Sequence, residues 1–496
     1  MSDDVNGSPE TTRKPWYRPR NIVLAILGLI AATIAYAWWW QASLKPTISH
    51  DYQADLIALA AAGQPEGENG WPHVERACEA AWDLRWGRAE EPFNLQFDFA
   101  ALLRSESASA DEARVGDARA DAPATEADIM RAIKALDGCG AFDALTRAMA
   151  CPRHVKTEFQ HDDDLPGYEE TLLGVLVPEV QSLRMLREVT LARMCLHARH
   201  GQTEAMLDDL QRALFIDEVL IQQPFMMHTM AGSRGAISTL NAVRQLVTHE
   251  PQDPETLGRF DDMIRRFPTT GHVESAIESE RFVMLDLVQH LFTDDGEGDG
   301  MLIMSKYNEI ASPMASVNDP TAEFTIDLPL GNYAGLLLAG RRETVKFLDG
   351  YFDRWRRRAR MSRDERLGSA EDSSPLVGNL PPRLAHTAIM FPVSERILET
   401  TDRLQSEVAG TRIMLAIERH RLGRGPHPTT LDDLVPDFLA ELPADPYSAD
   451  GIRYRAMSNP NPGDLPYALF SVGPDGEPDT DDDLKFTLPP KGAPSP

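Results

Sequence analysis

An apolar run without a charged residue, from Asn21 to Trp40, constrains this chain more than any other feature of its sequence. A helix of that length rises about 30 Å, which matches the hydrocarbon thickness of a bilayer. The last three residues of the run, Trp38 to Trp40, have rings that suit the lipid–water interface. The run therefore predicts a transmembrane helix over residues 21–40.

The charges on either side of this run predict its orientation. Basic residues precede it, and a single lysine follows closely: Arg13, Lys14, Arg18, Arg20 and then Lys45. By the positive-inside rule, residues 1–20 are expected to be a disordered cytoplasmic tail. The chain is then a single-pass protein of the cytoplasmic (inner) membrane with an extracytoplasmic body. A cleaved signal peptide is the alternative, because Ala35, Tyr36 and Ala37 have the form of a cleavage site.

Charge and cysteine content exclude some functions. The formal net charge is −28, and a field of that sign repels phosphate backbones, so we expect no nucleic-acid partner. None of the four cysteines belongs to a CxxC pair, which argues against a zinc ribbon or a thioredoxin-type motif: Cys78, Cys139, Cys151 and Cys195. They are either buried free thiols or, in an exported body, members of one or two disulfides, with Cys139 and Cys151 as candidates.

Apolar residues recur at helical spacing through most of the chain, so we expect a mainly α fold. The expected organisation is a spacer over 41–70, a body of helical hairpins over 71–405 and a C-terminal module over 406–496. Segments with few large apolar residues predict flexible insertions near 105–126, 294–300 and 362–380. Further helices are expected near 72–84, 127–149, 234–248, 255–266, 272–292 and 335–360.

One helical hairpin is well marked. Residues 181–199 carry an apolar stripe, Gly201 interrupts it, and a second helix continues to Pro224. The stretch from Ala192 to Ala205 resembles a tetratricopeptide helix pair, although it lacks the tryptophan and tyrosine of that family and no second copy follows. Stacked hairpins of this kind would supply concave binding surfaces.

The C-terminal segment carries an ordered set of motifs. After a helix that ends near Leu422 come HPTTL (427–431), LPADP (442–446), IRY (452–454), YALFS (467–471), GPDG (473–476) and an aspartate run that ends at Leu484. Together they resemble the C-terminal domain of the type II secretion major pseudopilins (type II secretion system protein G). The resemblance implies a small α+β module. The apolar run lies far upstream of this module and no Gly–Phe cleavage site precedes it, so the resemblance does not extend to filament assembly.

In that family the last loop binds calcium, which prefers six to eight oxygen ligands. The resemblance makes three aspartates the main expected ligands, Asp475, Asp482 and Asp483, with help from Ser471 and backbone carbonyls. Asp479 is a further candidate, although the spacing here is shorter than in many relatives. Calcium is the expected cofactor. The alternative is a solvated acidic tail.

Two other groups of residues are candidates for chemistry or binding. His272 and Glu278 lie on one expected helix and could form a carboxylate–histidine site, although a solvated helix face is the favoured interpretation. The basic cluster from Arg354 to Arg366 could contact anionic lipid or an acidic partner, or pair with acidic residues of the body.

No nucleophile elbow, P-loop or dinucleotide fingerprint occurs in the chain. The leading hypothesis is therefore a non-enzymatic, membrane-anchored interaction or scaffold protein of a bacterial envelope, with an unidentified protein partner and a calcium-stabilised C-terminal module. The alternatives are an accessory component of a secretion or pilus-like machine and an envelope enzyme with a site in the helical body.

Overall fold

A computed structural model describes residues 19–86, 126–161, 170–318, 337–369, 380–390, 395–457 and 466–487. Within these ranges the protein is mainly helical, which confirms the expected fold class. The chain forms two compact units. The first comprises Met1–Ser49, Leu287–Lys346 and Leu380–Ile389, and the second comprises His50–Asp286, Phe347–Asn379 and Met390–Pro496. Most of the predicted tail and of the predicted insertion at 105–126 lies outside the described residues.

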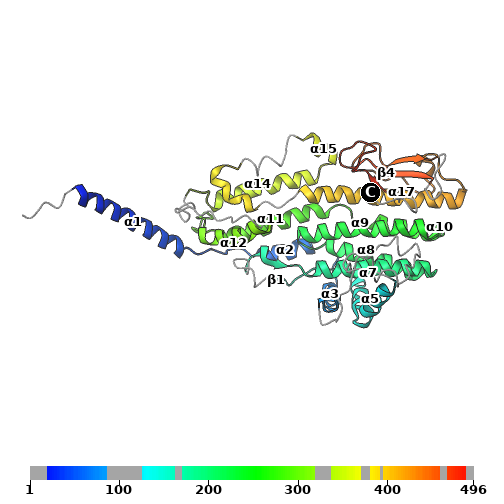
Figure 1. The fold of residues 1–496 in the computed structure, drawn as a ribbon, viewed down its shortest axis with the longest axis horizontal. Helices are drawn as coiled ribbons and strands as arrows, with labels where there is room; N and C mark the ends of the chain where they lie inside the picture. The colour runs from blue at the N-terminus through cyan, green and yellow to red at the C-terminus, as the bar shows by residue number, and fades with distance from the viewer. Residues whose placement is uncertain are drawn as a thin grey trace, which may run out of the picture. The chain divides into compact units, whose positions relative to one another are not determined.

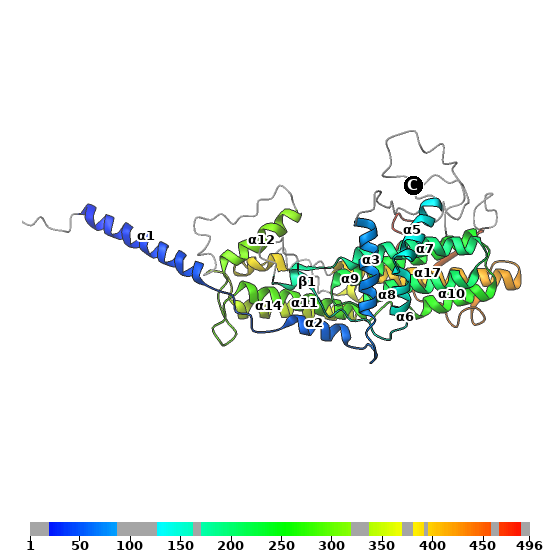
Figure 2. The same ribbon diagram turned by 90° about the horizontal axis from the view of Figure 1, so that it is seen from below.

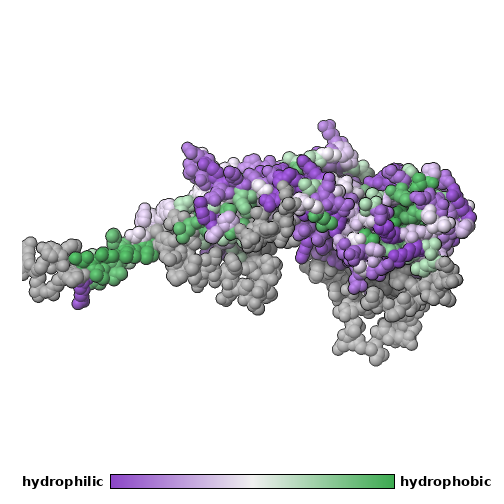
Figure 3. Space-filling view, turned by 90° about the horizontal axis from the view of Figure 1, so that it is seen from above, coloured by the Kyte–Doolittle hydropathy of each residue, from purple (hydrophilic) through white to green (hydrophobic). Residues whose placement is uncertain are grey.

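Helix α1 (Pro19–Ser43) contains the apolar run and exposes many of its large side chains, which form the green stretch in Figure 3. No helix in the described part of the chain is both long and apolar enough to cross a membrane. The prediction of a transmembrane helix over 21–40, and with it the single-pass inner-membrane location, is therefore wrong.

The first unit has a small core of its own. It contains α1, α12 (Met304–Asn318), most of η3 (Pro382–Met390), the end of α11 (His272–Leu291) and the start of α14 (Arg341–Ala359). The buried side chains of Phe292, Leu302 and Tyr307 belong to this core. A bridge between Phe292 and Leu302 closes the acidic loop that follows α11.

The second unit holds most of the helices. In addition to most of α11 and of α14, they are α2 (Tyr52–Ala61), α3 (Trp71–Trp86), α5 (Glu126–Gly138), α6 (Ala141–Met149), α7 (Glu179–Arg199), α8 (Thr203–Ile221), α9 (Met226–His249), α10 (Pro254–Arg266), α15 (Arg363–Gly368) and α17 (Glu395–Arg424). The short strands β1 (Gln160–His161) and β2 (Val175–Leu176), separated by η2 (Leu172–Gly174), pair antiparallel. The predicted helical hairpin is confirmed as α7 and α8, and Gly201 forms the turn with a φ of +67°.

Three apolar clusters make the core of this unit continuous. The first lies among α3, α5, α6, α7 and α8, and the second among α7, α8, α9, α10 and α17. Because α7 and α8 contribute to both clusters, the α3–α5–α6 group joins the same core. Figures 1 and 2 show α8, α9, α10 and α17 side by side.

Helix α17 also carries the C-terminal module. Strands β3 (Arg453–Ala456), β4 (Tyr467–Ser471) and β5 (Leu484–Lys485) form an antiparallel sheet in that order. The sheet and η4 (Leu431–Leu434) pack on α17 through the third cluster, which includes Tyr467, Leu469 and Phe486. A Cβ atom at Gly410 of α17 would lie 2.3 Å from the Phe486 ring, so glycine is required for this close approach.

Candidate functional site

A cavity of about 340 Å³ lies within the second unit. Four segments line it: the start of α11, the α14–α15 corner, the first three turns of α17 and the turn from Asp445 to Ala449. The corner is locally determined, because Ser362 and Glu365 form a capping box that begins α15 immediately after α14 ends. Residues 363–368 of the insertion predicted at 362–380 are thus helical, and residues 370–379 lie outside the described ranges.

The cavity wall contains arginines of the basic cluster, and each has an acidic partner. Arg360 donates to Glu274 at 2.6 Å and 2.9 Å, and Arg366 donates to the buried carboxylate of Asp402. Arg363 lies 3.6 Å from the same Asp402 carboxylate. Further along α14, Arg356 contacts Glu278 at 2.8 Å. Pairing with acidic residues of the body, one of the interpretations of this cluster, is thereby confirmed for these four arginines.

Asp445 differs from the other carboxylates that are buried in the wall. Its side chain is only 6% exposed, and its Oδ1 atom accepts a hydrogen bond from the Tyr447 N–H at 3.2 Å. Its Oδ2 atom is buried and has no hydrogen-bond partner among the described residues. A buried charged oxygen without a partner carries an uncompensated desolvation cost, so Asp445 is the group in this wall that is most in need of a donor.

Arg363 connects the cavity to the C-terminal module. Its Nη2 atom donates to the Pro474 carbonyl at 2.5 Å, and its guanidinium lies 4.8 Å from the centre of the Tyr447 ring. Pro474 belongs to the GPDG turn of the predicted calcium loop. One side chain therefore contacts the cavity wall and this loop at the same time.

The predicted calcium ligands do not all point to one place. Asp482 accepts from the Asp475 N–H at 2.9 Å and from the Thr480 hydroxyl at 2.6 Å, so it faces the inside of the loop. Asp483 accepts from the Asp479 N–H at 2.9 Å, and its Oδ1 atom is buried without a partner. The Ser471 hydroxyl is buried and accepts from the Gly473 N–H at 3.4 Å.

Asp479 faces outward instead. Both of its oxygens pair with Arg455, at 2.8 Å and 2.9 Å, and the Arg455 hydrogen bond lowers the pKa of Asp479 below its usual range. Within the described residues, no three carboxylates of this loop bring oxygens within 4.8 Å of one another. Asp483 therefore keeps one oxygen without a partner, whereas both oxygens of Asp479 are engaged by Arg455.

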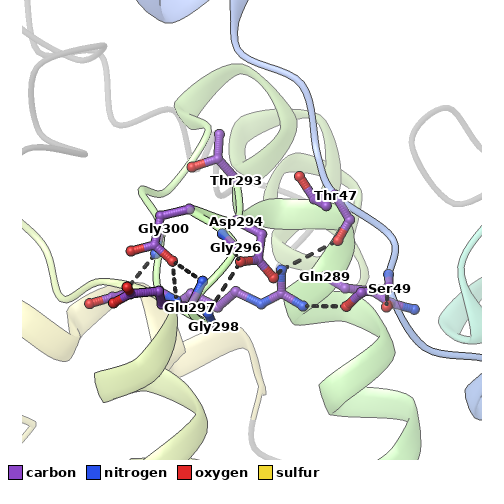
Figure 4. A network of polar contacts seen from close by, with 12 residues as sticks. Thr47, Ser49, Gln289, Thr293, Asp294, Gly296, Glu297, Gly298 and Gly300 are labelled. Atoms are coloured by element: carbon purple, nitrogen blue, oxygen red, sulfur yellow. Dashed lines mark hydrogen bonds and ion pairs between the residues drawn. The ribbon is translucent and has the colours of Figure 1, made fainter.

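The acidic loop at 294–300, predicted to be a flexible insertion, is closed by hydrogen bonds within the first unit. Figure 4 shows this network. Asp294 accepts from the N–H groups of Gly296 and Gly298, and its second oxygen pairs with Arg341 at 2.9 Å. Arg341 also donates to the Thr47 carbonyl at 3.3 Å. The carboxylate of Asp294 is thus already satisfied by protein groups.

The carboxylate–histidine pair proposed for α11 does not converge. Glu278 contacts Arg281 and Arg356, each at 2.8 Å, and is thereby engaged in ion pairs. Burial lowers the pKa of His272 to about 4, and the contacts of Glu278 do not include it. This geometry offers no support for an acid–base site at His272 and Glu278.

Sequence reasoning missed Asp445 as a candidate. The motif LPADP places Asp445 before a proline, which predicts a turn and nothing more. Asp445 becomes a candidate only because segments far apart in the chain meet around the cavity, whose lining residues lie between positions 270 and 449. The one signal available was the density of arginines after residue 354, which marks a wall of the cavity.

Searches against protein-family models, curated proteins and solved structures found no match for this chain.

Proposed function

We propose that the chain is a non-enzymatic interaction protein that receives a basic side chain of a partner protein in the cavity of its second unit. The observation that carries this proposal is the buried, unpartnered Oδ2 atom of Asp445. A lysine or arginine of the partner would supply the missing donor. A hydrogen bond between charged groups in a buried site is about twice as strong as a neutral one.

The charges of the cavity favour a cation over an anion. Its wall contains four carboxylates, at Glu274, Asp364, Asp402 and Asp445, and three guanidiniums, at Arg360, Arg363 and Arg366. The guanidiniums already contact Glu274 or Asp402, so an incoming anion would have to break an existing ion pair. The formal net charge of −28 also draws basic partners towards the protein.

The size of the cavity suits one anchoring side chain and its neighbours. A volume of about 340 Å³ is at the lower end of the range for small-ligand sites, which is roughly 300–1,000 Å³. A single buried cationic anchor surrounded by weaker contacts is a common arrangement in protein interfaces.

The C-terminal module would serve as a calcium-stabilised support for this cavity. A long helix followed by a three-stranded antiparallel sheet is consistent with the pseudopilin resemblance, which stays a proposal. Asp475, Asp482 and Asp483 would hold the ion, with Ser471 next to it, and calcium would neutralise carboxylates that belong to the same loop. Because Arg363 contacts both the loop and the cavity wall, it would couple calcium binding in the loop to the shape of the cavity.

Peptide binding tests the proposal. Three short peptides of glycine and alanine carry one central lysine, arginine or norleucine, and fluorescence anisotropy measures their binding to the full chain. We expect the lysine or the arginine peptide to bind at least tenfold more tightly than the norleucine peptide. Equal affinity for all three would contradict the proposal.

A further inference from the structure

Three side chains with metal-binding atoms meet outside the cavity, and they belong to the same unit. The ligand atoms of Glu68, His73 and Cys151 all lie within 4.8 Å of one another, and this is the single such group of three or more among the described residues. His73 lies in the first turn of α3, Glu68 precedes that helix, and Cys151 follows α6. The Nδ1 atom of His73 is buried and has no hydrogen-bond partner within the described chain.

Contacts that do not involve these three side chains hold the two segments together. The Gly70 N–H donates to the Arg153 carbonyl at 2.7 Å. The Asn69 side chain accepts from the Val155 N–H at 2.9 Å and donates to the Val155 carbonyl at 2.8 Å. The ligands are therefore brought together by the fold itself, which reduces the conformational entropy that a bound ion would otherwise have to remove.

Glycine is needed for this close approach. A Cβ atom at Gly70 would lie 2.8 Å from Cβ of Cys151, and one at Gly67 would lie 2.6 Å from the Pro152 ring. The loop from Gly67 to Gly70 thus lies directly against the segment that begins at Cys151. The Cβ atom of Cys151 therefore cannot move away from this loop unless the two segments separate.

The chemistry of the three ligands selects the kind of metal. Thiolate and imidazole ligands are typical of zinc and its neighbours in the first transition row, whereas calcium and magnesium prefer oxygen alone. Tetrahedral zinc, with bonds of 2.0–2.3 Å, places its ligand atoms about 3.5 Å apart, so small side-chain rotations would complete the set. A fourth position would remain open to water.

We propose that Glu68, His73 and Cys151 bind one divalent transition-metal ion of the zinc type, which fastens the loop before α3 to the segment after α6. On binding, the thiol of Cys151 loses its proton to the solvent and the sulfur forms a bond to the metal. Burial raises the pKa of the Cys151 thiol, and the negative charge of Glu68 raises it further. A divalent ion offsets both effects because it neutralises the two anions.

Cobalt titration of the full chain under reducing conditions tests this site. Thiolate ligation of Co²⁺ gives a sulfur-to-metal charge-transfer absorption in the near ultraviolet. We expect this absorption at one equivalent, its loss in Cys151→Ser, and a fall in Co²⁺ affinity of about tenfold or more in His73→Asn. Cys139→Ser is the matched control, because Cys139 is an exposed free thiol outside the group, and it should bind as the wild type does.

The pH dependence of binding gives an independent readout. Because one proton leaves for each ion bound, the apparent affinity should rise about tenfold per pH unit between pH 7 and pH 8. Far-ultraviolet circular dichroism without metal checks that each variant is folded. The proposal is overturned if the folded wild type shows no charge-transfer absorption, or if Cys151→Ser keeps it.

Discussion

Replacing Glu179 by glutamine should destabilise the second unit strongly. Glu179 is the first residue of α7, and its Oε1 atom accepts from Lys156 at 2.7 Å and from His228 at 2.8 Å. All three side chains are nearly inaccessible to solvent, with exposures of 6%, 6% and 0%. Burial lowers the pKa of His228, which keeps it neutral at pH 7, so Lys156 carries the charge that compensates Glu179.

The magnitude follows from the pKa of Glu179. Burial alone would raise this pKa, but the interactions with His228, followed by those with Lys156, outweigh it and lower the pKa from 4.5 to about 2. A shift of that size corresponds to about 3 kcal/mol. Because the glutamine variant also leaves Lys156 buried without a counter-charge, we expect a loss of about 3–5 kcal/mol in the free energy of unfolding at pH 7.

The contribution of Glu179 to the free energy of unfolding should change with pH in a defined direction. The pKa of Glu179 is lower in the folded state, so its stabilising contribution is complete above about pH 4.5 and disappears as the pH falls towards 2. Urea denaturation of wild type and Glu179→Gln, followed by circular dichroism, should therefore show a difference that shrinks over this interval. The variant Lys156→Met/Glu179→Leu should recover part of the loss, because it removes both buried charges. A loss below about 1 kcal/mol at pH 7, or one that stays constant down to pH 2.5, would refute this reasoning.

Three further predictions concern other parts of the second unit. Gly410→Ala should cost about 1–3 kcal/mol in urea denaturation, since its Cβ would collide with the Phe486 ring. Burial raises the pKa of Asp217 to about 6. Stability should therefore fall as the pH rises from about 4 to 6, and thermal denaturation of Asp217→Asn should show no such fall. Calcium should raise the melting temperature of the wild type and of Asp479→Asn but not of Asp483→Asn, since Asp479 is paired with Arg455 whereas Asp483 has a free oxygen.

Most helices were predictable because the apolar stripe of a helix, and the residue that ends it, lie within one short segment of sequence. Gly201 separates α7 from α8 in the sequence and in the structure. The segment 127–149, expected to be one helix, is instead α5 and α6, and Gly140 at a φ of +78° makes the turn between them. Strand pairing in the C-terminal module likewise follows motifs that lie close together in the chain.

Helix α9 shows why local patterns fail at buried elements. It begins at Met226, whereas the sequence predicted a start near 234. A Cβ atom at Gly232 would lie 2.6 Å from the Asp217 carbonyl oxygen, and one at Gly235 would lie 2.0 Å from the Asp217 side chain. These glycines permit close helix packing, and no single segment of sequence contains that information.

The candidate sites were less predictable for the same reason. Asp445 and Arg363 come from distant parts of the chain, and so do His73 and Cys151. The residues of each pair come together only when the segments pack, and neither pair belongs to a sequence motif of fixed spacing. The aspartates of the C-terminal loop were visible in the sequence, but their orientation depends on partners such as Arg455, which lies on another strand.

Calorimetric titration of a lysine- or arginine-containing peptide into the wild type, Asp445→Asn and Asp450→Asn tests the central claim most directly. Asp450 is an exposed residue that pairs with Arg453 outside the cavity, so its replacement removes the same charge from the same segment. We predict one site per chain, a loss of affinity of at least tenfold in Asp445→Asn, and wild-type affinity in Asp450→Asn. Equal binding by all three proteins would contradict the assignment of the cavity as the binding site.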